Sequence, residues 1–70
     1  MTDTARLERA ISESGYKKSY IAKVIGLTPA TLSRKIRNSA EFKASEMEGL
    51  CRLLGITDPR VKNAIFFAKE

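Results

Sequence analysis

The chain has 70 residues, enough for one domain, and carries a net charge of +5 from 13 basic and 8 acidic side chains. Hydrophobic residues make up 43% of it and charged residues 30%, which is typical of a soluble globular domain and not of a disordered one. With no His and one Cys, the chain lacks a hydrolytic triad, a zinc site of ordinary spacing and an internal disulfide. We therefore expect a protein that is not an enzyme and binds no metal or cofactor.

Apolar side chains recur at helical spacing in the first third of the chain and predict two helices there. The first covers residues 3–14 or 4–14 and ends before Gly15. The second covers residues 18–25 and ends before Gly26, although Lys17 stands where a capping Ser or Thr is usual. The residues expected to face the core are Leu7, Ala10, Ile11, Ile21, Ala22 and Ile25.

The third predicted helix has the clearest beginning. Thr28 can cap its first turn through the hydroxyl, and Pro29 suits the first helical position, where no N–H is needed. The helix should end near Arg37, because Asn38 can leave it with positive φ.

The fourth helix is expected over residues 44–54, before Gly55. Phe42, in the loop before this helix, is too apolar to be left in water, and we expect its side chain to be buried in the core. The core stripe of this helix is Met47, Leu50, Cys51 and Leu54. Cys51 is thus interpreted as a small buried residue and not as a reactive thiol.

The last predicted helix covers residues 58–69 and begins with Asp58-Pro59, a cap followed by proline. One face carries Val61, Ala64, Ile65 and Ala68. Phe66 and Phe67 are adjacent and cannot both point the same way, so we expect one or both at a dimer interface. The alternative is that both enter the core from different sides.

The basic charge is confined to one segment, residues 15–40, which contains no Asp or Glu. Its basic residues are Lys17, Lys18, Lys23, Arg34, Lys35 and Arg37. The remaining residues have a net charge of −1, so the whole surplus lies in this segment. A segment of one sign indicates a surface for a polyanion. The short link around Gly26 is in addition typical of a helix-turn-helix over residues 18–37.

A helical wheel of the third helix separates an inner face from an outer one. The inner face holds Pro29, Leu32 and Ile36, and Lys35 lies at its edge. The outward face holds Ala30, Thr31, Ser33, Arg34 and Arg37. Arg34 can pair with guanine, and the methyl groups of Ala30 and Thr31 can touch thymine. The residues expected to reach phosphates are Lys17, Lys18, Lys35, Arg37 and Asn38.

The stretch YIAKVIGLTPATLSRKIRN resembles the Cro/repressor-type (XRE-like) helix-turn-helix family, through Ile21-Ala22, Gly26-Leu27-Thr28 and Leu32-Ser33. The continuation LSRKIRNSAEFKASEMEGLCRLLGI is similar to a subgroup of small phage and prophage regulators. The resemblance extends over residues 5–68.

This resemblance implies a compact all-α, five-helix, lambda-repressor-like DNA-binding domain over residues 1–70, with the third helix in the major groove of an operator. It implies that Lys18 contacts phosphate and that Pro29, Ala30 and Arg34 contact bases. Many members of the family have polar residues at Pro29-Ala30 and an aromatic-acidic pair at Lys35-Ile36. The third helix is therefore more basic here.

We expect a transcriptional regulator, Cro-like or repressor-like, that binds double-stranded DNA as a weak homodimer. The alternative is a modulator that binds a phage repressor protein and does not itself read DNA. RNA binding is disfavoured, because Tyr16 and Tyr20 are too few for a stacking platform. The start of the chain lacks a secretory signal and no apolar run reaches ~20 residues, so we expect the bacterial cytosol and nucleoid, without membrane contact.

Overall fold

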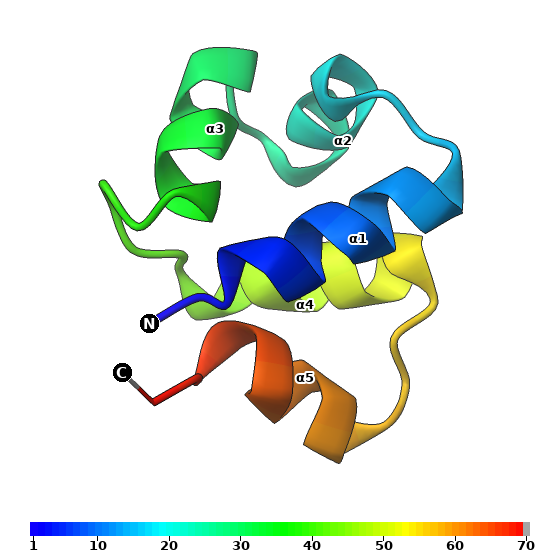
Figure 1. Ribbon diagram of the computed structural model, residues 1–70. Helices are drawn as coiled ribbons and strands as arrows, with labels where there is room; N and C mark the ends of the chain where they lie inside the picture. The colour runs from blue at the N-terminus through cyan, green and yellow to red at the C-terminus, as the bar shows by residue number, and fades with distance from the viewer. Residues whose placement is uncertain (70) are drawn as a thin grey trace.

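Five helices make up most of residues 1–69, the part of the chain that the computed structural model describes (Figure 1). They are α1 (Thr4–Ser14), α2 (Lys18–Ile25), α3 (Pro29–Ile36), α4 (Ala44–Leu54) and α5 (Pro59–Phe66). No strand occurs in this range, so the predicted all-α, five-helix fold is confirmed. None of these helices is long and apolar enough to cross a membrane.

The helices enclose one hydrophobic core. Helix α1 packs against α3, α4 and α5, whereas α2 packs against α3 and α4. In Figure 1, α2 and α3 lie on one side of α1 and α5 lies on the other, with α4 behind α1. The buried apolar residues are Leu7, Ile11, Ile21, Ala22, Leu32, Ile36, Phe42, Leu50, Cys51, Ile65 and Phe66. The sequence therefore predicted most of the core, including Phe42 and Cys51.

Two apolar residues that the sequence placed on inner faces lie outside instead. Pro29 is exposed, because it occupies the first position of α3, beyond the turn that packs on the core. Val61 is 45% exposed, whereas Ile65, one turn later in α5, is buried. Each is near the start of a helix whose later turns make the contact.

The last helix is shorter than predicted, since α5 ends at Phe66 and not near residue 69. The N–H of Ala68 donates to the carbonyl of Met1 at 2.9 Å instead of continuing the helix. The ring of Phe66 packs edge-on against Phe42, with centroids 5.5 Å apart, so Phe66 belongs to the core. Its assignment to a dimer interface was wrong, and only its neighbour Phe67 faces outward, with 57% exposure.

The N-terminal segment, Met1–Asp3, joins the end of α3 to the end of α5. The Thr2 N–H donates to Asn38 Oδ1 at 2.8 Å, and Asn38 Nδ2 donates to the Thr2 carbonyl at 2.9 Å. On the other side, the Asp3 N–H donates to the Ile65 carbonyl at 2.6 Å. The backbone of this segment thus holds together two helix ends that are far apart in the sequence.

Candidate nucleic-acid interface

Helices α2 and α3 are joined by a tight turn of three residues, Gly26–Thr28. Gly26 has a φ of 82°, which a side chain would strain, and the Leu27 N–H donates to the Ala22 carbonyl at 2.8 Å. The Thr28 hydroxyl then accepts from the Thr31 N–H at 3.2 Å, as expected for a capping threonine. These local contacts fix where α3 leaves the turn.

The outward face of α3 agrees with the helical wheel. Ala30 and Arg34 are exposed, and Arg37, which ends the helix, is exposed as well. Leu32 and Ile36 are fully buried beneath them. Small side chains therefore occupy the first turn of the exposed face, and long cationic ones follow.

The two hydroxyl residues proposed to contact bases border this face. Thr31 and Ser33 are half-buried, and the Thr31 hydroxyl already accepts a hydrogen bond from the Thr28 hydroxyl at 2.9 Å. Pro29 is exposed beside Ala30, so all five candidate base-contacting residues lie on or beside the outward surface of α3. Their contact with bases stays a prediction.

Four of the six basic residues in segment 15–40 are exposed and form no ion pair within residues 1–69. They are Lys17, Lys23, Arg34 and Arg37. An exposed cation without an acidic partner gains most from a phosphate, because nothing has to be broken first. Exposed cations without an ion pair therefore remain on α2 and α3 and at their ends.

Lys35 does not belong to that surface. Its ammonium lies 2.6 Å from Glu46 Oε1 on α4, and both side chains are buried. The assignment of Lys35 to a phosphate contact was wrong, because its position at the edge of the core face carries the ammonium inward to an acid. Burial raises the pKa of Glu46, but hydrogen bonds from the Lys35 ammonium and the Lys43 N–H outweigh it, so the pKa lies below its ordinary value.

Asn38 is also committed to an internal role. It adopts the predicted positive φ, 65°, but its amide is paired with both backbone groups of Thr2. One of its two amide N–H groups and its oxygen are therefore used inside the protein, but the residue is exposed, and its contact with phosphate stays a prediction.

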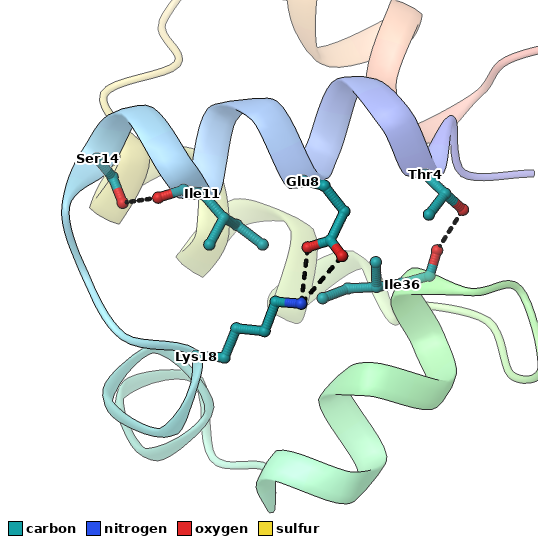
Figure 2. A network of polar contacts seen from close by, with 6 residues as sticks. All are labelled: Thr4, Glu8, Ile11, Ser14, Lys18 and Ile36. Carbon is teal, nitrogen blue, oxygen red and sulfur yellow. Dashed lines mark hydrogen bonds and ion pairs between the residues drawn. The ribbon is translucent and has the colours of Figure 1, made fainter.

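Helix α1 holds both outer ends of the helix-turn-helix (Figure 2). Lys18, the first residue of α2, places its ammonium 2.8 Å from Glu8 Oε1 and 3.0 Å from Oε2. One turn earlier on α1, the Thr4 hydroxyl donates to the carbonyl of Ile36, the last residue of α3, at 2.6 Å. Two polar side chains of α1 thus contact the start of α2 and the end of α3.

The sequence contains a signal for these internal contacts, namely two acidic residues that lie beside buried apolar stripes. A helical wheel of α3 alone does not include these acids, because they lie on α4 and α1. Glu46 lies four residues before Leu50, on the core stripe of α4, and an acid there requires a cation or several donors. Glu8 lies three residues before Ile11, at the border of the buried stripe of α1. Neither position identifies the cation that the acid meets.

The described residues offer no site for metal chemistry. Among residues 1–69, no three His, Cys, Asp or Glu side chains lie close enough together to hold a metal ion. Cys51 is buried, and burial raises the pKa of its thiol, which disfavours the reactive thiolate.

Two short helices joined by a glycine turn, the second with an exposed basic face, define a helix-turn-helix protein. The chain belongs to the Cro/C1-type helix-turn-helix DNA-binding family, whose sequence pattern matches residues 6–59. The predicted resemblance is thereby confirmed at the level of this family. No curated protein and no solved structure matches the chain. The protein is therefore a DNA-binding transcription regulator whose partner is double-stranded DNA.

Proposed function

We propose that the protein binds an operator sequence-specifically, with α3 in the major groove, as a Cro-like or repressor-like regulator of phage or prophage type. The observation that carries the proposal is the exposed face of α3, where Arg34 has no ion-pair partner within residues 1–69 and follows one turn after the small Ala30. Small residues allow the helix to approach the bases closely, and an unpaired guanidinium can read guanine O6 and N7.

The candidate contacts divide by chemistry into two sets. Those proposed to touch bases are Pro29, Ala30, Thr31, Ser33 and Arg34. Those proposed to touch phosphates are Lys17, Lys18, Arg37 and Asn38. The proposed role is binding without catalysis, and the proposed location is the bacterial cytosol and nucleoid.

A weak homodimer completes the proposal. Two recognition helices can read two half-sites about 34 Å apart, and one small domain reads only a few base pairs. The exposed ring of Phe67, at the end of α5, supports a contact between two copies.

The decisive experiment is an unbiased selection of bound duplexes, followed by fluorescence-anisotropy titrations of the selected and random sequences. Arg34→Ala should bind the selected duplex about 10- to 100-fold more weakly, because a bidentate base contact contributes about 1–3 kcal/mol of discrimination. Random DNA should lose far less. Arg52→Ala, which removes an exposed arginine on α4, is the matched control.

Two results contradict the proposal. If the wild-type protein binds no duplex at about 50 mM salt, where phosphate contacts are strongest, the DNA-reading role is wrong. If, in addition, the protein forms a tight complex with a phage repressor, the alternative role as a modulator replaces it. If Arg34→Ala binds both duplexes as the wild type does, Arg34 does not read bases.

A further inference from the structure

Glu8 lies on α1, outside the basic segment of residues 15–40, and its carboxylate contacts a lysine near the start of that segment. Its carboxylate contacts the Lys18 ammonium with both oxygens, at 2.8 and 3.0 Å (Figure 2). Both side chains are partly exposed, 44% for Lys18 and 43% for Glu8. A ligand arriving from solvent can therefore reach this pair, unlike the buried pair of Lys35 and Glu46.

The position of Lys18 favours contact with a phosphate. It is the first residue of α2, and the preceding Lys17 provides no side-chain cap, so the N–H groups of the first turn are not satisfied by a capping side chain. A helix start with free N–H groups and a cation attracts an anion. In this structure the anion beside Lys18 is the Glu8 carboxylate.

We propose that Glu8 weakens DNA binding by competing with a backbone phosphate for the Lys18 ammonium. The inference rests on the proposed function, in which Lys18 contacts phosphate. A phosphate oxygen that bonds to the ammonium lies well within the screening length of about 8–10 Å from the carboxylate, so the two anions repel each other. DNA binding must therefore either displace the Lys18 ammonium from the Glu8 carboxylate or lose part of the attraction between Lys18 and the phosphate. Because a phosphate contact carries no sequence information, Glu8 weakens operator and random DNA equally.

Glu8→Gln tests this, because it keeps the shape of the side chain and removes its charge. Glu13→Gln is the matched control, since Glu13 is also on α1 and paired to an arginine, but at 3.9 Å and on a largely exposed pair. Both variants raise the net charge by one, so any difference between them reflects position. Lys18→Met, alone and combined with Glu8→Gln, shows whether the effect passes through Lys18.

Dissociation constants are measured by anisotropy, with the selected duplex and a random duplex, from about 50 to about 200 mM salt. Relative to Glu13→Gln, Glu8→Gln should bind both duplexes roughly threefold to tenfold more tightly at the lower salt, with an unchanged ratio between them. Its plot of log affinity against log salt should steepen by less than about 0.9, the contribution of one full phosphate contact, because Lys18 already makes part of this contact in the wild type. In the Lys18→Met background, Glu8→Gln should lose most of this gain.

The inference is overturned if Glu8→Gln behaves like Glu13→Gln, or if its gain survives in the Lys18→Met background. It is also overturned if Glu8→Gln weakens binding, because Glu8 then positions Lys18 for the phosphate instead of competing with it. In all these cases the wild type still binds DNA and the proposed function stands. Failure of the wild type to bind any duplex would reject both.

Discussion

Lys35 of α3 and Glu46 of α4 form a buried ion pair, with 2.6 Å between the ammonium and Oε1. The same oxygen accepts the Lys43 N–H at 2.9 Å, so one carboxylate connects the last turn of α3 with the first turn of α4. Among residues 1–69, this is the side-chain hydrogen bond that joins these two helices directly. The last turn of α3, which carries Arg34 and Lys35, is thus bonded directly to α4.

Removing one partner of this pair should be much worse than removing both charges. Lys35→Met leaves a buried carboxylate without its cation and should lower the free energy of unfolding by about 3–5 kcal/mol. Lys35→Met with Glu46→Gln should recover at least about 2 kcal/mol of this, because Gln still accepts from the Lys43 N–H. Urea denaturation followed by circular dichroism gives both values.

The exposed pair of Arg9 and Glu13 serves as the control for that comparison. Arg9→Met should change the free energy of unfolding by less than about 1 kcal/mol, since exposed pairs contribute little. A double variant no more stable than Lys35→Met would show that the cost comes from lost packing of the lysine stem and not from the stranded charge.

Acid should weaken the fold partly through Glu46. Its pKa in the folded protein lies below the ordinary value of 4.5, so the unfolded chain binds more protons than the folded one between these two values. The stabilisation is therefore complete above pH 4.5 and is lost as the pH falls through the folded-state pKa. The urea midpoint of the wild type should drop across this window, and that of Glu46→Gln should drop less steeply.

Asp58 provides the comparison, because hydrogen bonds from Arg60 also lower its pKa, but on the surface. Asp58→Asn should leave most of the acid dependence in place. An equally flat profile in Asp58→Asn and in Glu46→Gln would mean that the buried pair is not the main acid-sensitive element.

Asn38 combines a backbone role with a side-chain role, and two substitutions separate them. Asn38→Gly keeps the φ of 65° without strain and should cost about 1–2 kcal/mol for the lost hydrogen bonds to Thr2. Asn38→Ala should cost about 1 kcal/mol more, because alanine resists the left-handed conformation. Thermal or urea unfolding measures both, and equal costs would contradict the strain argument.

Phe66 and Phe67 are neighbours in sequence whose substitution should destabilise the protein by very different amounts. Phe66→Ala opens a cavity beside Phe42 and should lower the free energy of unfolding by about 3–5 kcal/mol. Phe67→Ala should cost less than about 1 kcal/mol, because the ring is mostly in solvent. If the homodimer forms through Phe67, this variant should also bind a two-half-site duplex less cooperatively. Unchanged cooperativity would remove Phe67 from the interface.

The sequence predicted the helices well because their boundaries are local. Thr28-Pro29 and Asp58-Pro59 begin α3 and α5 where expected, since a cap and a proline act on their own first turn. The outward face of α3 followed from periodicity alone. The C-terminal limit of α5 did not, because it depends on the Met1 carbonyl, at the opposite end of the chain.

The error at the candidate interface has the same cause. Lys35 has the charge expected of a phosphate contact, but it meets an internal partner, Glu46, that only the folded chain brings near. A wheel of one helix gives the direction of a side chain and does not show what lies in that direction.

The N-terminal segment links the end of α3 to the far side of the domain. Thr2 holds Asn38 just after α3, and the adjacent Asp3 is bonded to Ile65 in α5. If α5 opens, the hydrogen bond between Asp3 and Ile65 is lost, and the hydrogen bonds between Thr2 and Asn38 should weaken with it. If DNA binds only the closed form, binding should suppress this opening by mass action. Amide hydrogens in α5, which lie far from the proposed groove contacts, should then exchange more slowly in the complex than in the free protein.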